Sequence, residues 1–243
     1  MANLVSLHSQ VHKDLKVIPA QADVQTADLN MMPVMLSEFL KLAVQYPITL
    51  SKNKETGQFV CVAVLGFAYG ENLFWDEGRW SALYRPLHLE RQPFSLGEQK
   101  GEFLLCFDSS ADCMSERHGE VLFDEQGGPT RYLQKKQAVL AELLEGEEKS
   151  KAFIDTLTSL NLVKALQLDI TFENGESERV NGLYGIDEVA FKQLPDEELL
   201  KLNALGYVAH IYSMIVSMGQ VYRLVQKKNQ RLAKASAPEL KSA

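Results

Sequence analysis

The residue types best suited to binding chemistry gather in one stretch of the chain, residues 66–94. Both tryptophans lie there, five residues apart, and three arginines are interspersed among the aromatic side chains. Aromatic rings can stack on planar or sugar-like groups, and a guanidinium can hold a carboxylate or phosphate through two parallel hydrogen bonds. The stretch therefore predicts a surface that holds a protein partner or a small ligand. The residues expected to bind are Glu71, Asn72, Trp75, Trp80, Tyr84 and Arg91.

The same stretch also has a purely structural interpretation, in which its own aromatic side chains pin an irregular segment with a turn at residues 76–78. A further alternative is an enzyme of unrecognised mechanism. Because the sequence carries no phosphate-binding loop, nucleophile elbow or zinc-protease motif, a binding function is favoured over catalysis, and no cofactor is expected. The residues available to such an enzyme would be Glu71, Asp76, Tyr84 and Arg91, with Glu38 or Asp108 as a base.

A second cluster combines acidic residues with one cysteine and one histidine: Asp108, Asp112, Cys113, Glu116 and His118. Such side chains can bind metals, but the Cys-x4-His spacing matches no paired zinc motif. Neighbouring carboxylates raise the pKa of a thiol and so oppose its use as a nucleophile. The sequence therefore predicts neither a metal site nor a catalytic cysteine here.

The overall charge and cysteine content favour a cytoplasmic protein. The 243 residues carry a formal net charge of -7 and include three cysteines. A negative net charge disfavours binding to nucleic acid or anionic lipid, and a low, odd cysteine count is typical of a reducing compartment. No signal-peptide pattern is seen at Met1, and the longest apolar stretch, residues 59–69, is too short to span a membrane.

The elements that must position these residues are partly readable from the sequence. Apolar residues at helical spacing predict a helix from Leu36 to Val44, which Pro47 ends. Further helices are expected over residues 133–144, 151–160, 195–206 and 207–224, the last being the longest. The acidic residues 142–148 are interpreted as a solvated helix end or loop. Runs rich in β-formers predict strands over residues 47–50, 59–67, 102–107, 119–123, 164–172 and 178–186.

Strands and helices do not alternate strictly, so the predicted fold class is α+β with a mixed or antiparallel sheet and helices in the middle and at the C-terminus. A single domain over residues 1–243 is expected, with a candidate sub-lobe boundary near residues 146–150. Residues 230–243 are expected to form a frayed basic tail. The basic end of the last helix has a membrane-surface or partner role as its alternative.

Several blocks resemble the SapC family of bacterial proteins. They include Tyr-Pro-Ile at residues 46–48, Glu-Asn-Leu-Phe at residues 71–74 and Pro-Phe at residues 93–94, in matching order over most of the chain. An arginine pair commonly precedes the Pro-Phe block, whereas this chain has Arg91 alone. The residues that carry the resemblance are Glu38, Tyr46, Pro47, Pro86, Pro93, Phe94, Asp124, Gly182 and Tyr184.

The resemblance implies a family named for association with a surface array, whose molecular activity is poorly defined. Members are often encoded near flavin-dependent tryptophan-halogenase-like proteins and TonB-dependent receptors, which implies a halogenase-like protein or a surface-export or uptake component as partner. The resemblance thus fits an accessory binding protein, with a surface-layer component as a further alternative. An unrelated peptide-transport permease shares the family's name, and the missing membrane spans exclude it.

Overall fold

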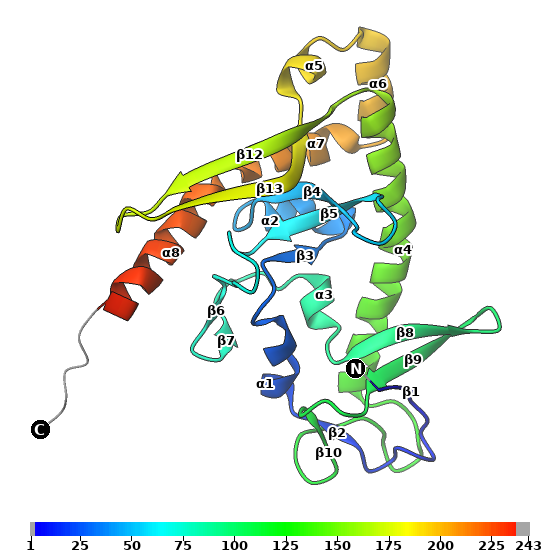
Figure 1. The fold of residues 1–243 in the computed structure, drawn as a ribbon. Coiled ribbons are helices and arrows are strands. Elements are labelled where there is room, and N and C mark those ends of the chain that lie inside the picture. The colour runs from blue at the N-terminus through cyan, green and yellow to red at the C-terminus, as the bar shows by residue number, and fades with distance from the viewer. Residues whose placement is uncertain (1–2, 237–243) are drawn as a thin grey trace, which may run out of the picture. The chain divides into compact units, whose positions relative to one another are not determined.

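The computed structural model describes residues 3–236, and the fold is α+β with antiparallel sheets, as the sequence predicts (Figure 1). The chain divides into two interleaved compact units. Unit 1 contains residues 1–27 and 75–149, and unit 2 contains residues 28–74 and 150–243. The sequence-based expectation of a single domain with a boundary near residues 146–150 stays a prediction.

Unit 2 is built on a five-stranded antiparallel sheet in the order β12-β13-β4-β5-β3. Its central strands are rich in β-branched residues, and Ile48, Leu50, Val62 and Val64 are all buried. The strands are β3 (Met31–Pro33), β4 (Ile48–Lys52), β5 (Phe59–Val64), β12 (Val163–Thr171) and β13 (Ser177–Ile186).

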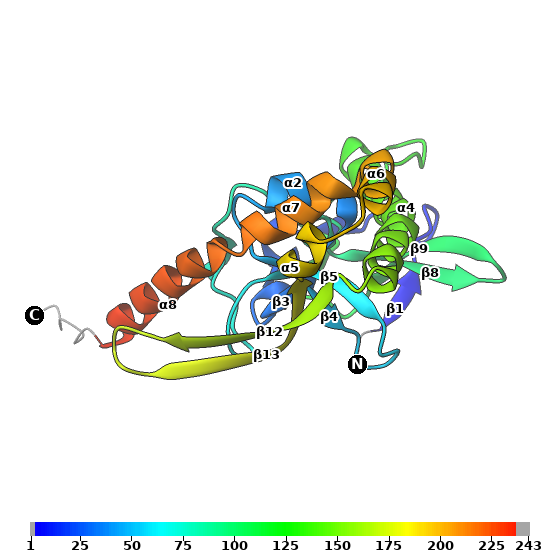
Figure 2. The ribbon, with the colours of Figure 1, turned by 90° about the horizontal axis from the view of Figure 1, so that it is seen from above.

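Helices cover this sheet in unit 2. Helix α7 contacts β13, β4 and α2, and Figure 2 shows α7 and α8 running along one side of the β12–β13 hairpin. Phe39 packs edge-on against Phe153 at 6.0 Å, and Tyr46 lies 4.5 Å from Phe74, measured between ring centroids. The helical elements are η2 (Leu36–Glu38), α2 (Phe39–Leu42), α5 (Glu188–Lys192), α6 (Asp196–Ala204), α7 (Tyr207–Ser217) and α8 (Gln220–Ser236).

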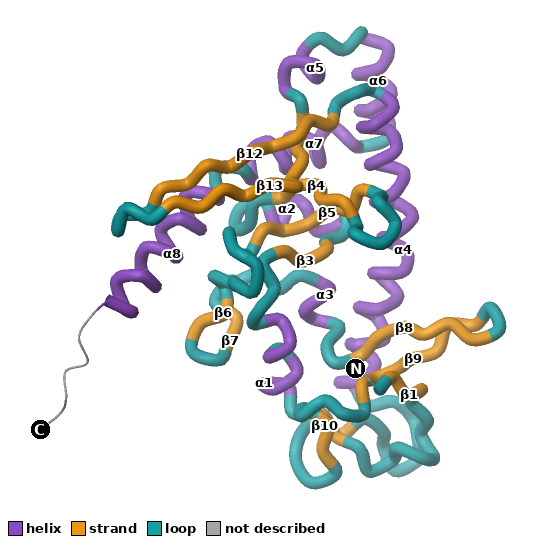
Figure 3. Tube along the Cα trace, in the orientation of Figure 1, coloured by secondary structure: helices purple, strands orange, loops and turns teal. Residues whose placement is uncertain are grey.

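Unit 1 has a three-stranded sheet in the order β1-β9-β8, and much of the rest of the unit is loop (Figure 3). Buried Phe94, Phe107, Leu133 and Leu140 form its core. The strands are β1 (Leu4–Ser6), β2 (Lys16–Val17), β6 (Trp75–Asp76), β7 (Arg79–Trp80), β8 (Phe94–Gln99), β9 (Glu102–Asp108), β10 (Met114–Ser115) and β11 (Glu120–Val121). The helices are α1 (Pro19–Ala22), η1 (Val24–Thr26) and α3 (Leu87–Glu90), together with the first part of α4 (Arg131–Ser159).

Two helix predictions are wrong. The acidic stretch does not end a helix at residue 144, because α4 continues through it as one helix from Arg131 to Ser159. Conversely, the stretch expected to be one helix over residues 207–224 breaks after Ser217, and α8 runs on to Ser236. The longest helix is therefore α4, and the part of the tail at residues 237–243 lies outside the described residues.

Other boundaries differ less. The predicted strand over residues 59–67 ends at Val64, and the one over residues 119–123 is reduced to Glu120–Val121. The first predicted helix is present as the two short turns η2 and α2, and Leu40 and Val44 of its predicted apolar stripe are 65% exposed.

No single helix in the described part of the chain is long and apolar enough to cross a membrane. One pair, α6 with the α7–α8 segment, meets that test only jointly and is bent by 95°.

Candidate binding cavity

The stretch singled out from the sequence is shared between the two units. Residues up to Phe74 belong to unit 2, and residues from Trp75 onward belong to unit 1. The predicted binding residues Glu71 and Asn72 are therefore described with unit 2, and the tryptophans and arginines with unit 1.

Glu71 lies in a largely buried ion pair that holds α8 in unit 2. Its Oε1 accepts a hydrogen bond from Lys228 Nζ at 2.6 Å, and its Oε2 accepts one from the Phe67 amide at 3.0 Å. The two paired side chains are only 12% and 14% exposed. Although burial lowers it, the carboxylates of Glu71 and Glu178 together raise the pKa of Lys228 above its usual value.

The neighbouring Asn72 also serves this attachment. It is buried, its Oδ1 accepts a hydrogen bond from the Phe74 amide, and its carbonyl oxygen accepts one from Arg231 Nη2 at 2.6 Å. The Lys227 ammonium lies 5.2 Å from the centre of the Phe74 ring. The Glu-Asn-Leu-Phe block thus anchors the basic face of α8.

The two tryptophans face each other across a tight hairpin in unit 1. Trp75 pairs with Trp80 in the β6–β7 ladder, and the turn residues Glu77 and Gly78 have φ of 48° and 79°. Two consecutive positive φ values are typical of a two-residue hairpin turn, so the turn predicted at residues 76–78 is present. Trp80 is buried, and Trp75 is half-buried.

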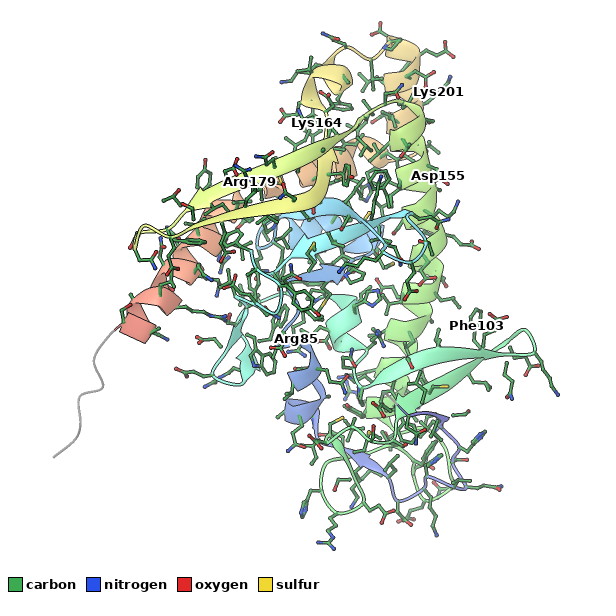
Figure 4. The ribbon with its side chains drawn as sticks, in the orientation of Figure 1. Arg85, Phe103, Asp155, Lys164, Arg179 and Lys201 are labelled. Atoms are coloured by element: carbon green, nitrogen blue, oxygen red, sulfur yellow. The ribbon has the colours of Figure 1, made fainter. Side chains whose placement is uncertain are left out.

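Arg85 follows the half-buried Tyr84 and lies beside α1 (Figure 4). Its Nη2 donates to Asp23 Oδ2 at 2.8 Å, and its Nε donates to Glu90 Oε1. Although burial lowers it, the hydrogen bonds to these two carboxylates raise the pKa of Arg85. The side chain is thus fixed by partners on both sides.

Arg91, the last predicted binding residue, lies directly after α3. Its Nη1 donates to the Phe94 carbonyl at 2.7 Å and its Nε to His88 Nδ1 at 3.4 Å, whereas Nη2 has no hydrogen-bond partner among residues 3–236. Burial lowers the pKa of Arg91, and burial together with the Arg91 charge lowers the pKa of His88 to about 4. At neutral pH, His88 is therefore an uncharged acceptor that helps to orient the guanidinium.

Arg91 and His88 border a cavity of about 400 Å³ within unit 1, here called the Arg91 cavity. The opposite walls are apolar and come from the β8–β9 hairpin and from α4. Ser95 and two exposed carboxylates, Glu98 and Glu147, complete the lining. The apolar residues are Leu96, Phe103, Leu140, Leu143 and Leu144. Figure 4 labels Phe103 on β9, where the side chain is 55% exposed.

The remaining family-pattern residues of unit 2 have structural positions. Glu38 Oε2 accepts a hydrogen bond from the Met35 amide at 2.8 Å, and Tyr46 is fully buried before Pro47. Gly182 has φ of 79° at the irregularity where β13 shifts register against β12, and Tyr184 packs edge-on against Phe59.

The remaining family-pattern residues of unit 1 flank α3 and close a turn. Pro86 precedes α3, Pro93 is joined to Gln92 by a cis peptide bond, and buried Phe94 begins β8. Asp124 Oδ1 accepts hydrogen bonds from two amides of its own turn, those of Gln126 and Gly128.

The acidic cluster around Cys113 has no metal-binding geometry. Among the described residues, no group of three His, Cys, Asp or Glu side chains could hold a metal ion. Asp108 caps its own turn through Ser110, and burial raises the pKa of the Cys113 thiol.

His88 and the leucines of α4 were missed by the sequence analysis. His88 occurs as a single histidine in an irregular stretch, and the leucines read as ordinary core positions of a helix. The pairing of His88 with Arg91 at a spacing of three residues, across one turn of helix, is the signal that could have found it.

Comparison with protein families matches the SapC family over residues 7–224. No curated protein and no solved structure gives a significant match. The matched range covers most of the sequence and contains both the Glu-Asn-Leu-Phe block and the Arg91 cavity, and the chain belongs to the SapC family.

Proposed function

We propose that the protein is an accessory binding protein that holds a small ligand in the Arg91 cavity. The ligand class is an organic acid, with a carboxylate that meets Arg91 and an apolar body that lies against the leucines of α4. No cofactor takes part in this function.

One observation carries the proposal: Arg91 is oriented by two hydrogen bonds while Nη2 stays unpaired beside an apolar cavity. An unpaired guanidinium nitrogen in a partly buried site gains more from an anionic acceptor than an exposed one does, because water competes less. Since the pKa of His88 is lowered to about 4, its ring adds no positive charge at neutral pH. Arg91 is thus the cation on which ligand selection depends.

The dimensions and chemistry of the walls support the rest of the ligand assignment. Small-molecule sites are commonly about 300–1,000 Å³, mostly apolar, with a few polar groups that set orientation. The five apolar side chains of the Arg91 cavity fit an alkyl or aryl body. Glu98 and Glu147 are exposed, so solvent and salt weaken their repulsion of an anion.

The test is calorimetric titration of the full chain with matched pairs of ligands, such as octanoate with octanol and phenylacetate with phenylethanol. We expect each carboxylate to bind more tightly than its alcohol. Arg91→Gln should weaken carboxylate binding about tenfold or more while leaving alcohol binding unchanged, because a charge-assisted hydrogen bond contributes about 1.5–3 kcal/mol.

Arg79→Gln is the matched control, since Arg79 belongs to the same stretch but is exposed on the β6–β7 hairpin and does not border the cavity. It should bind like the wild type. Equal affinity for acid and alcohol, or wild-type affinity of Arg91→Gln for octanoate and phenylacetate, would refute the proposal.

The proposal also covers location and partners. The acidic composition and the three cysteines support a cytoplasmic protein. The family resemblance adds the expectation that the ligand belongs to a surface-layer, uptake or halogenase-linked process, with a protein partner as the alternative occupant of the aromatic segment. Cell fractionation with a tagged full chain tests the location, and recovery in the membrane or surface fraction would contradict it.

A further inference from the structure

A second cavity of about 420 Å³ lies within unit 1 and has a different character from the Arg91 cavity. The short helix α1 provides small side chains on one side, and one face of α4 provides Tyr132, Lys135, Lys136 and Val139. Asp23 directly after α1, Arg85 in the loop before α3 and Glu90 at the end of α3 complete the lining. This second cavity is here called the Tyr132 cavity.

A fixed ionic network forms one wall of the Tyr132 cavity. Arg85 is held between Asp23 and Glu90, as described above, so both carboxylates already have a cationic partner. Lys136 Nζ donates to the Glu90 carbonyl oxygen at 2.5 Å and lies 5.3 Å from the centre of the Tyr132 ring. These contacts place the Lys136 ammonium at the cavity without giving it a carboxylate of its own.

Several donors in this cavity lack acceptors. Tyr132 Oη is buried and has no hydrogen-bond partner in the part of the chain that the structure describes. Within the same residues, Arg85 Nη1 also has no partner and Lys136 Nζ makes one hydrogen bond, while Lys135 borders the cavity as an exposed cation. Because an unsatisfied buried polar group is costly, the orphaned hydroxyl is an independent sign of an absent acceptor.

The net charge of the residues that line the Tyr132 cavity also favours an anionic ligand. Three cationic side chains, Arg85, Lys135 and Lys136, border the cavity against the two carboxylates of Asp23 and Glu90. Burial lowers the pKa of Lys136 despite those carboxylates, so its positive charge is incompletely compensated. Burial, with nearby acidic groups, also raises the pKa of Tyr132, which keeps its hydroxyl protonated and able to donate.

We propose that the Tyr132 cavity is a binding site for a small oxyanion, with Tyr132 Oη, Lys135 and Lys136 as its donors. The site is separate from the Arg91 cavity and does not depend on the function proposed for it. A phosphate group and a carboxylate group share the chemistry that these donors recognise, so both sources are tested.

The test is titration of the full chain with inorganic phosphate in one arm and with acetate and succinate in the other, at low ionic strength. Binding of any of these ions is expected to weaken about tenfold in Lys136→Gln and in Tyr132→Phe, since each change removes one donor to a charged acceptor. The arm with the higher affinity identifies the oxyanion class.

Stability measurements separate a lost ligand contact from a damaged fold. Tyr132→Phe deletes a hydroxyl that has no partner in the ligand-free protein, so its midpoint of urea unfolding should equal or exceed that of the wild type without phosphate. With phosphate present, the wild type should gain stability and the variant should gain much less.

Two controls make the outcome specific. Lys149→Gln removes an exposed lysine from the same helix and should bind like the wild type. Arg91→Gln should also retain phosphate binding, which distinguishes failure of this site from failure of the Arg91 cavity. Absence of saturable binding by every ion tested, or binding unchanged in both Tyr132→Phe and Lys136→Gln, would overturn the proposal.

Discussion

At the scale of single residues, the arginines and histidine around α3 differ in how fully their hydrogen-bond donors are used. Two nitrogens of Arg85 donate hydrogen bonds to carboxylates, whereas two nitrogens of Arg91 donate to neutral acceptors. The positive charge of Arg91 is therefore not neutralised by either of its hydrogen-bond partners. His88 makes this possible, because its ring nitrogen accepts from Arg91 only while it is unprotonated. The protonation state of one imidazole therefore supports the geometry of the Arg91 cavity.

This dependence predicts an acid-sensitive contribution to stability from His88. Its pKa is about 4 in the folded chain, below the usual 6.5 of the unfolded chain. Between these values the unfolded chain takes up a proton that the folded chain does not, so stability falls as pH drops from 6.5 to 4. The loss from this group should approach about 2–3 kcal/mol at pH 4.

Urea unfolding of the wild type and of His88→Asn at intervals from pH 4 to pH 7 measures this contribution. The asparagine oxygen can still accept from Arg91 but does not titrate in this range, so the variant should show a flatter profile. His118→Asn, which changes an exposed histidine of the same unit, should keep the wild-type profile. Identical profiles for His88→Asn and the wild type would show that His88 is not held neutral.

At the scale of elements, the sequence predicts those turns whose own residues favour the backbone conformation that is observed. The turn before Arg79 and the Asn174-Gly175 turn of the β12–β13 hairpin follow from residues that tolerate positive φ. The hydrogen bond between Lys228 of α8 and the largely buried Glu71 could not be predicted, because it joins positions 157 residues apart. A sequence pattern shows that Glu71 is acidic, but only the tertiary fold supplies its lysine.

The wrong prediction of a helix end within α4 has the same cause, because tertiary burial decides it. Residues 142–148 read as a helix end because four of them are glutamates, yet the buried positions Leu143, Ser150, Phe153 and Leu157 continue the helical spacing on either side. Exposed pairs between Lys149 and Glu145 and between Lys151 and Asp155 lie on the outer face at a spacing of four residues. Tertiary burial of one face outweighs the charge of the other.

Continuity of α4 predicts that Glu148→Pro is strongly destabilising. In an uninterrupted helix, proline removes a backbone hydrogen bond and clashes with the preceding turn, at a cost of about 3 kcal/mol or more. Glu148→Ala is the control and should be nearly neutral, because the side chain is exposed. Circular dichroism and urea unfolding measure both. A proline variant as stable as the alanine variant would restore the interpretation of two helices separated by a loop.

At the scale of the whole molecule, the chain passes between the two units three times, after residues 27, 74 and 149. Each unit nevertheless has a core of its own, formed around Phe94 and Phe107 in unit 1 and around Phe39 and Phe153 in unit 2. The Arg91 cavity is lined entirely by unit 1. The family match over residues 7–224 includes segments of both units, and it contains every residue that lines the Arg91 cavity.

This division predicts where a bound carboxylate changes the dynamics of the chain. A ligand at a hundred times its dissociation constant stabilises the state that binds it by about 2.7 kcal/mol. Amide hydrogen exchange should therefore slow by up to about a hundredfold in α3, β8, β9 and residues 139–147, and it should stay unchanged in β12, β13 and α7, which contribute nothing to the cavity.

The comparison is made by mass spectrometry on the full chain with and without octanoate, and again with Arg91→Gln, in which the difference should vanish. Slowing that extended equally into β12, β13 and α7 would mean that the two units open together. A ligand effect that spared α3 and β8 would place the carboxylate elsewhere. Protection confined to unit 1 requires both the ligand site and independent opening of the units, so a single exchange map tests the residue, the elements around it and the division of the molecule at once.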